Sequence, residues 1–307
     1  MGTAAVYRLD PREELEYLLD KSLFCLARAA GSAEPALDEL IHGLGAAGAS
    51  AATWKRHPLY RLLDQDPFTR RARSRHSGDA VAMDFVFRGL PHRQRRLTTR
   101  VGQAIFEYTA ELSGVARGIR TRRDGIAKAI DAAIARVGTP RILSVGCGHL
   151  RELSLSSAGA TKLGAMYALD ADPQCLDVVR EEHSHVRALE TVHATVRDIL
   201  KATISFEQLD LIYAANLFES LAEPVARALL ARLVEMLAPG GKLLVANLIP
   251  TVPNLGLLDG VMEWPILWRT EEQLASLVDG THADRIECLT TYADADETIA
   301  YLDVVRR

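Results

Sequence analysis

Residues 141–148 read Arg-Ile-Leu-Ser-Val-Gly-Cys-Gly, a short apolar run followed by two glycines with one residue between them. The apolar run predicts a buried strand over residues 141–145. Gly146 and Gly148 permit a tight turn and let the backbone approach a ligand closely. Because ligands of open α/β sheets bind beyond the carboxyl ends of the strands, this turn is the first candidate binding site.

The chain after residue 138 alternates between strand-like and helix-like stretches. Further apolar runs of strand length lie at residues 166–170, 191–196, 209–214 and 243–247, and two more candidates lie at 285–288 and 300–305. Helical stretches at 173–182 and 224–237 separate the earlier runs. This alternation predicts an α/β fold with a Rossmann-like, doubly wound, mostly parallel seven-stranded sheet.

Residues 1–138 carry helical patterns only. Asp10 followed by Pro11 is typical of a helix N-cap and a first helical residue. The period changes after the sequence Gly-Thr-Pro at residues 138–140. We therefore expect an all-helical N-terminal cap with substrate contacts over residues 1–138 and a Rossmann-like cofactor-binding domain over residues 139–307.

The composition is that of a globular protein. Of 307 residues, 48% are hydrophobic and 25% are charged, which excludes a disordered or fibrous chain. The net charge of −4 gives no sign of a nucleic-acid or membrane partner. The first ten residues lack the apolar region of a signal peptide, and the four cysteines are scattered without a C-x-x-C pair. These features predict reduced thiols, a cytoplasmic location and no metal site.

Two acidic residues extend the candidate site beyond the glycine turn. Asp170 ends the second predicted strand, where a carboxylate accepts hydrogen bonds from both hydroxyls of a ribose. Asp198 is expected at the end of the third strand, where it can accept from the exocyclic amine of adenine. Asp172 precedes a proline and is expected to cap the next helix instead. Either carboxylate alone is typical of a helix cap, but the ordered set predicts a pocket for an adenosine-bearing cofactor.

These motifs, together with Asp-Leu-Ile-Tyr at residues 210–213 and Pro-Gly-Gly-Lys at 239–242, resemble the class I S-adenosylmethionine (SAM)-dependent methyltransferases. The resemblance covers residues 139–307. It implies that the methionine end of SAM lies over Gly146, Cys147 and Gly148, the ribose on Asp170 and the adenine beside Asp198. The cofactor residues expected in addition are Ala171, Arg197 and Asn216. His149 and its neighbours replace the third glycine of a nicotinamide-dinucleotide site, which disfavours a pyrophosphate ligand.

A narrower resemblance concerns the acceptor. Residues 148–153, 213–221 and 262–272 are similar to bacterial enzymes that make 3-hydroxypalmitic acid methyl ester. The chain departs from them at Asn216 and Phe218, where such relatives tend to carry glycine and tyrosine. The acceptor is therefore expected to be a small molecule with a hydroxy-acyl or carboxylate group. The candidate catalytic residues are Asn216, Tyr108 and Tyr213, and the candidate substrate residues are Phe85, Phe106, Trp264 and Arg269.

Other interpretations stay open at this point. The layout and the Gly-x-Gly-x-Leu turn also resemble nicotianamine and azetidine-2-carboxylate synthases, which transfer or cyclise the aminobutyrate chain of SAM and release methylthioadenosine. A non-catalytic partner subunit with the same fold is a further alternative. A basic stretch could bind RNA, an acyl-carrier protein or the phosphate of a CoA thioester, although a solvated helix face is the plainer interpretation. Its members are Arg70, Arg71, Arg73, Arg75, Arg93, Arg95, Arg96 and Arg100.

Overall fold

The computed structural model describes residues 10–28, 33–75, 78–157, 161–279 and 283–307. Residues 1–9, on which the expected lack of a signal peptide rests, lie outside the described residues. The chain forms two compact units. Unit 1 comprises Met1–His76, Arg88–Ala116 and Thr251–Pro265, and unit 2 comprises Ser77–Phe87, Arg117–Pro250 and Ile266–Arg307. Both units therefore draw on segments from either side of residue 138.

Unit 1 is helical in its described parts. The helix α1 begins where the sequence predicts, because Asp10 accepts hydrogen bonds from the backbone of Arg12 and Glu13, and Pro11 is the first helical residue. The unit includes α1 (Pro11–Ala27), α2 (Glu34–Ala46), α3 (Ala51–Trp54), α4 (Pro58–Leu63), α5 (Pro67–Ser74), α7 (His92–Leu97), α8 (Arg100–Phe106), η1 (Glu107–Leu112), α13 (Val252–Leu255) and η4 (Gly256–Val261). The last two elements follow the fifth strand in the chain and pack on α2.

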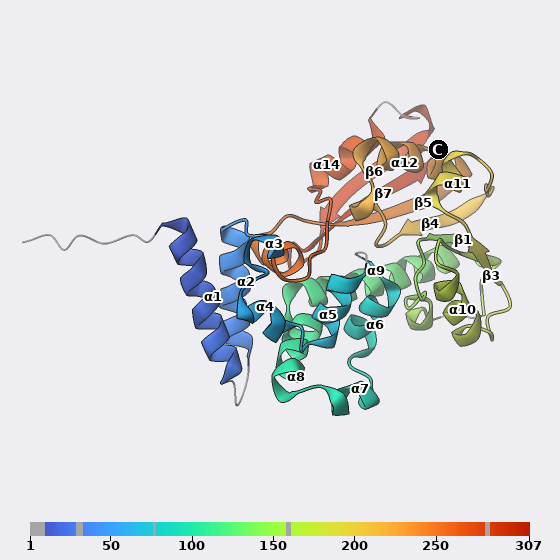
Figure 1. Cartoon of the computed structure of the whole chain (residues 1–307). Coiled ribbons are helices and arrows are strands. Elements are labelled where there is room, and N and C mark those ends of the chain that lie inside the picture. The colour runs from blue at the N-terminus through green and yellow to red at the C-terminus, as the bar shows by residue number, and fades with distance from the viewer. Residues whose placement is uncertain (1–9, 29–32, 76–77, 158–160, 280–282) are drawn as a thin grey trace, which may run out of the picture. The chain divides into compact units, whose positions relative to one another are not determined.

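Unit 2 contains a seven-stranded sheet in the order β3-β2-β1-β4-β5-β7-β6 (Figure 1). The strands are β1 (Arg141–Val145), β2 (Ala165–Asp170), β3 (Leu189–His193), β4 (Leu209–Ala214), β5 (Leu237–Leu248), β6 (Ile286–Ala293) and β7 (Ile299–Arg306). The first five strands pair in parallel, and β7 runs antiparallel to both β5 and β6. The predicted α/β Rossmann-like fold with a helical N-terminal region is confirmed.

Helices cover both faces of the sheet. Alternate residues of β1 and β7, such as Leu143 and Leu302, belong to one core cluster with α12 and α14. Tyr301 points to the other face, where its hydroxyl lies 4.0 Å from the position of a Cβ on Gly125 of α9. The helices of the unit are α6 (Ala80–Arg88), α9 (Gly114–Val137), η2 (Leu153–Leu155), α10 (Pro173–Glu182), α11 (Val196–Leu200), η3 (Phe218–Ser220), α12 (Glu223–Met236), α14 (Glu271–Ala275), η5 (Ser276–Val278) and η6 (Ala283–Arg285).

Two strands differ from their predicted bounds. The third strand ends at His193, because Thr195 caps α11 and Val196 is already helical. The fifth strand begins at Leu237, ahead of the Pro-Gly-Gly-Lys sequence. Gly240 has a φ of +73°, and the pairing register between β4 and β5 shifts at this point. The expected turn is therefore an irregularity within the strand, of the kind that glycine permits.

Candidate active site

The glycine turn after β1 has the geometry that its sequence predicts. Gly146 has a φ of +69° and Gly148 a φ of +51°, which side chains with a Cβ rarely adopt. The amides of Gly146 and Cys147 both donate to the carbonyl of Leu169, over 2.8 and 3.0 Å. The turn is thereby fixed against the end of β2, beside the point where strand order reverses between β1 and β4.

Asp170 lies at the end of β2 and is oriented by the turn. Its Oδ2 accepts from the amide of Gly148 over 2.8 Å, and its Oδ1 accepts from the amide of Asp172 over 2.9 Å. The residue is half-buried. Each carboxylate oxygen can accept a second hydrogen bond, so the pair fits the two adjacent hydroxyls of a ribose. Asp172 instead caps α10 by accepting from the amide of Gln174, as predicted.

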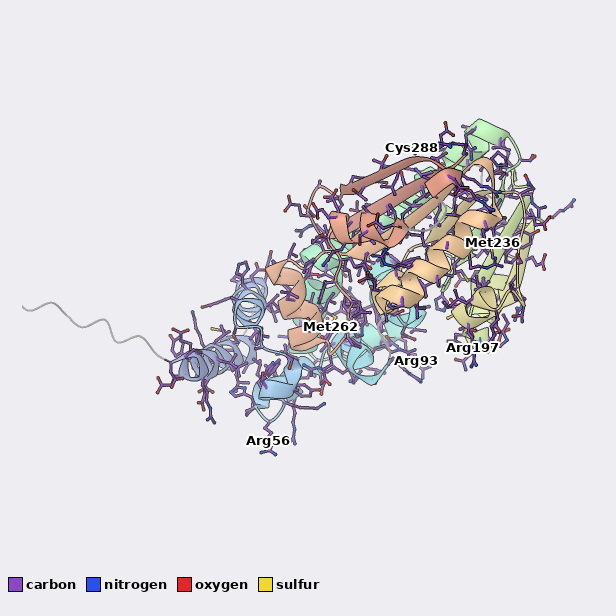
Figure 2. The ribbon with its side chains drawn as sticks, turned by 90° about the horizontal axis from the view of Figure 1, so that it is seen from above. Arg56, Arg93, Arg197, Met236, Met262 and Cys288 are labelled. Carbon is purple, nitrogen blue, oxygen red and sulfur yellow. The ribbon has the colours of Figure 1, made fainter. Side chains whose placement is uncertain are left out.

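The residues expected around an adenine have a different arrangement. Asp198 does not end a strand: it is the third residue of α11 and forms a capping box with Thr195. Hydrogen bonds from Thr195 lower the pKa of the Asp198 carboxyl. Arg197 is exposed at the surface of α11 (Figure 2). The carbonyl of Ala171 lies 3.2 Å from Nε2 of His193. The roles of Ala171, Arg197 and Asp198 toward a cofactor stay predictions.

Asn216 follows β4 and is held by an arginine that the sequence did not single out. Its Oδ1 accepts from Nη2 of Arg122 in α9 over 2.7 Å. Its amide nitrogen packs against Gly78, since a Cβ on that glycine would lie 2.4 Å away. Glu219 lies one turn further along the chain, with its Oε2 3.6 Å from Nη1 of Arg122. Polar groups thus gather at the carboxyl end of β4, where an acceptor is expected.

Tyr213 and Glu152 form a buried pair beside this group. The hydroxyl of Tyr213 donates to Oε1 of Glu152 over 2.7 Å. Burial raises the pKa of both side chains, that of Tyr213 well above its usual value. Because its pKa is raised, the Tyr213 hydroxyl stays protonated, so it serves as a hydrogen-bond donor to Glu152 rather than as a base. The catalytic role expected for Tyr213 stays a prediction.

Helix α6 fixes the loop that follows the glycine turn. Both oxygens of Asp84 accept from the guanidinium of Arg151 over 2.6 Å, and Oδ2 also lies 2.8 Å from Nδ1 of His149. Burial opposes ionisation of Asp84, but these hydrogen bonds prevail and lower its pKa. Arg151 also pairs with Glu182 of α10. In the sequence, the only sign of this network is that His149 and Arg151 lie two residues apart.

The aromatic residues predicted to contact substrate are buried. Phe85 lies in α6 of unit 2, whereas Phe106, Tyr108 and Trp264 belong to unit 1. Tyr108 donates to Oδ1 of Asp38 over 2.5 Å, and the indole of Trp264 donates to the carbonyl of Ala72 over 3.1 Å. An open pocket of about 300 Å³ in unit 1 is lined by Leu90, Arg95, Arg100, Gln103, Ala104, Phe106, Glu107 and Glu111. Substrate contact by Phe85, Phe106 and Trp264 stays a prediction, as does the catalytic role expected for Tyr108.

Arg269 is buried and its donors are engaged within unit 2. Its Nη1 donates to the carbonyl of Phe218 over 2.6 Å and to Oδ1 of Asn247 over 3.0 Å. Its Nη2 donates to the carbonyl of Leu221 over 2.6 Å. These contacts fix the loop between β4 and α12. Contact between Arg269 and a substrate carboxylate, as predicted, would have to replace one of these bonds.

We expect Arg269→Met to lower the free energy of unfolding by about 3 kcal/mol, because it leaves buried oxygens without their donors. Urea denaturation measures this change. Arg227→Met is the matched control, since Arg227 forms a more exposed pair with Glu223 on α12 and should change stability by less than about 1 kcal/mol. An equal loss of unfolding free energy in Arg269→Met and Arg227→Met would contradict the structural role of Arg269.

The four cysteines are expected to differ in reactivity. Cys25 and Cys288 are exposed, whereas Cys147 and Cys175 are buried and all four are free. Burial raises the pKa of the Cys147 and Cys175 thiols. At pH 8 we expect iodoacetamide to label these two at least about 10-fold more slowly than the exposed pair, because fewer thiolates form. Peptide mass spectrometry over time measures the rates, and equally fast labelling of Cys147 would refute the expectation.

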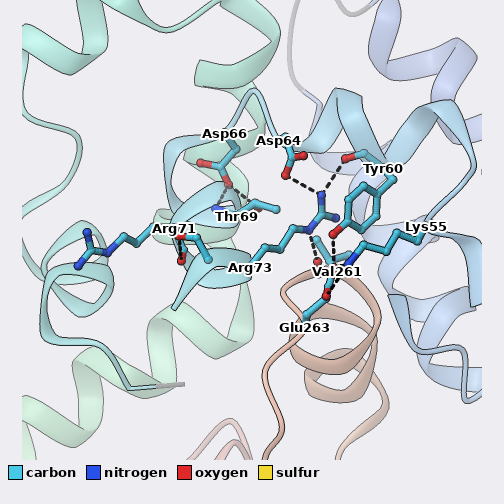
Figure 3. A network of polar contacts seen from close by, with 10 residues as sticks. Lys55, Tyr60, Asp64, Asp66, Thr69, Arg71, Arg73, Val261 and Glu263 are labelled. Atoms are coloured by element: carbon cyan, nitrogen blue, oxygen red, sulfur yellow. Dashed lines mark hydrogen bonds and ion pairs between the residues drawn. The ribbon is translucent and has the colours of Figure 1, made fainter. Parts of the chain in front are cut away.

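The basic stretch divides into structural and exposed arginines. The side chain of Arg73 is 5% exposed and donates to the carbonyls of Tyr60 and Val261 and to Asp64, all over 2.7–2.8 Å (Figure 3). Tyr60 and Lys55 bind Glu263 in the same network. Arg73 thus ties residues 251–265 to α4. Arg93, labelled in Figure 2, is exposed together with Arg95, Arg96 and Arg100, and their binding of an anionic partner stays a prediction.

Among the described helices, none combines the length and hydrophobicity needed to cross a membrane.

Comparisons with solved structures support the fold. Solved structures with this fold include a possible exported protein from Bordetella parapertussis (TM-score 0.64, 14% identity, 99% of both chains covered). They also include CurJ carbon methyltransferase (TM-score 0.53, 15% identity, covering 96% of this chain and 90% of that chain). A further example is a candidate methyltransferase from Thermobifida fusca (TM-score 0.56, 14% identity, covering 78% of this chain and 98% of that chain).

A comparison with protein families finds a match for part of the chain. No curated protein matches the chain. Residues 142–241, which run from β1 into β5, match a family model described as a methyltransferase domain. The glycine turn, Asp170 and Asn216 all lie in the matched range. Residues 142–241 are therefore similar to a methyltransferase domain, and SAM is the cofactor expected for such a domain.

Proposed function

We propose that the protein is a SAM-dependent methyltransferase that acts on a small hydroxy-acyl or carboxylate acceptor. The observation that carries the proposal is Asp170, whose two oxygens are oriented by the backbone amides of Gly148 and Asp172 and can each accept one more hydrogen bond, as two ribose hydroxyls would donate. This arrangement lies inside the segment that matches the methyltransferase domain. We also propose a cytoplasmic location, a specialised or signalling pathway, and delivery of the acceptor as a free acid, a CoA thioester or an acyl-carrier conjugate.

Different residues of unit 2 would bind the cofactor and the acceptor. Bound SAM would supply an electrophilic methyl group on a sulfonium: a carboxylate oxygen, which has no proton to lose, would bond to the methyl carbon while the carbon–sulfur bond breaks and S-adenosylhomocysteine leaves. The glycine turn and Asp170 would orient the cofactor, and Asn216 at the end of β4 would orient the acceptor. Positioning accounts for most of the rate in such a transfer, so a strong general base is not required.

The test is to incubate the full chain with SAM and a panel of short hydroxy acids and their thioesters, and to identify the products by mass spectrometry. We expect S-adenosylhomocysteine together with an acceptor that is one methylene unit heavier. Methylthioadenosine with a four-carbon amino acid product would overturn the proposal in favour of aminobutyrate chemistry. Failure to bind SAM at all would point to a non-catalytic partner subunit.

A further inference from the structure

The strand β6 lies at one end of the sheet, and among the described residues no strand pairs with its outer side (Figure 1). Between Cys288 and Ala293 this eight-residue strand contains no charged residue and no proline. Folded proteins usually shorten an edge strand or place charges or proline on it, because an open edge pairs with further strands. The register shift of β6 falls between Ile286 and Cys288, at the start of this segment. Residues 288–293 therefore form an unprotected edge.

The opposite edge of the sheet, β3, has the usual protection. It has five residues, and Glu190 within it is charged and exposed. Arg180 of α10 also reaches this strand and donates to the hydroxyl of Thr191 over 2.7 Å. The chain thus protects one edge of its sheet and leaves the other open, which indicates that the open edge has an occupant.

The backbone of β6 presents hydrogen-bonding groups outward at every second residue. The amide of Asp294 donates to the carbonyl of Ile299 over 2.9 Å and continues the register of the β6–β7 pair. Hydrogen-bonded and non-hydrogen-bonded pairs alternate along an antiparallel ladder. The amides and carbonyls of Leu289, Thr291 and Ala293 accordingly point away from β7, where another strand can bind them.

A second copy of β6 fits this edge. Antiparallel pairing that uses the outward groups of all three residues in both chains places Thr291 opposite itself and forms about six hydrogen bonds. The same register brings Leu289, which is 38% exposed, beside Ala293 of the other copy. It also directs Arg285 toward the exposed Glu297 of the other copy. Among residues 284–298, no two like charges come directly opposite each other in this register.

We propose that the protein forms a symmetric dimer in which the β6 edges of two copies pair antiparallel, so that the two seven-stranded sheets become continuous. The uncharged edge, its outward backbone groups and the match between Arg285 and Glu297 support a second copy as the occupant. Paired edges bury a small area, so we expect a dissociation constant on the order of 10 μM. The inference goes beyond the proposed function and does not depend on it.

Sedimentation equilibrium of the full chain tests the dimer. We expect twice the chain mass of 33.6 kDa at about 200 μM and mainly single chains at about 1 μM. Thr291→Lys puts two like charges opposite each other and should weaken the dimer at least about 10-fold. Its melting temperature should not fall, because lysine is common on edge strands. Glu190→Lys on β3 is the matched control and should dimerise as the unmodified chain does.

Engineered cysteines test the register. With Cys25 and Cys288 replaced by serine, Thr291→Cys should give a disulfide-linked dimer on oxidation with diamide, because the Cα atoms of an opposite pair lie about 5.5 Å apart. The control carries only Cys25→Ser and so keeps Cys288 as its exposed cysteine. In this register the two copies of Cys288 lie about 20 Å apart and should not link.

A charge exchange tests the ends of the edge. Arg285→Glu should weaken the dimer about fivefold, and adding Glu297→Arg should restore it. Failure of the second substitution to restore the dimer would overturn the inference, even if Thr291→Lys proved less stable than the unmodified chain.

Single chains at about 200 μM would overturn the inference, whatever the variants do. A dimer unaffected by Thr291→Lys would also overturn it, because the interface would then lie elsewhere. Cross-linking through Cys288 as fast as through Thr291→Cys would do the same.

Discussion

Asp170→Ala is expected to weaken the binding of S-adenosylhomocysteine at least about 100-fold. Two hydrogen bonds from ribose hydroxyls to a carboxylate are each worth about 1.5–3 kcal/mol, and every 1.4 kcal/mol changes the affinity tenfold. The substitution also removes the acceptor for the amide of Gly148, which is one of the hydrogen bonds between the turn and β2. Isothermal titration calorimetry measures the change.

Asp172→Asn is the matched control for this experiment. Asp172 lies two residues from Asp170 and carries the same charge, but its side chain caps α10. Asparagine caps helices about as well as aspartate, so the fold should be preserved. We expect the affinity of this variant to stay within about twofold. Equal weakening in both variants would show that charge alone, and not the geometry of Asp170, governs binding.

Gly256→Ala is expected to destabilise unit 1 by about 3 kcal/mol. Gly256 begins η4, and a Cβ added there would lie 1.8 Å from the carbonyl oxygen of Ile41 and 2.7 Å from its carbon. Both atoms belong to the backbone of α2 and cannot rotate away, so the two elements must separate. Trp54 and Trp264 are buried in the same unit, and their fluorescence during urea denaturation reports its unfolding.

Gly125→Ala provides the control for the loss of a glycine. Gly125 lies within α9, and its added Cβ would meet only the Tyr301 hydroxyl at 4.0 Å. Alanine in a helix interior is favoured over glycine by about 0.5–1 kcal/mol, so this variant should be slightly more stable. A Gly256→Ala variant as stable as the unmodified chain would mean that η4 does not pack on α2 as described.

Local sequence patterns predicted those parts of the site that are formed by residues close together in the sequence. The apolar run before Gly146 identified β1, and the acid at the end of the next run identified Asp170, because both signals lie within one strand and its turn. Asp198 was wrongly placed at a strand end, although Thr195 three residues earlier already indicated a capping box. A short apolar run before a cap does not reveal by itself where the strand stops.

Contacts between distant segments could not be predicted in this way. Arg122 resembles the other arginines of α9, and only its burial beside Asn216 distinguishes it. Asp84 reaches His149 and Arg151 across more than 60 residues of sequence. The segment 251–265 follows a sheet strand yet packs on α2, which no local pattern indicates. Such pairings depend on tertiary packing, which periodicity along the chain does not encode.

The most direct test of the account is calorimetric titration of the unmodified full chain with S-adenosylhomocysteine, followed by titration with NADH. We expect one binding site per chain, with a dissociation constant on the order of micromolar, and no binding of NADH, because Arg151 stands where a dinucleotide site requires its third glycine. Binding of NADH, or no heat with S-adenosylhomocysteine at about 1 mM, would contradict the assignment of the glycine turn and Asp170 to SAM.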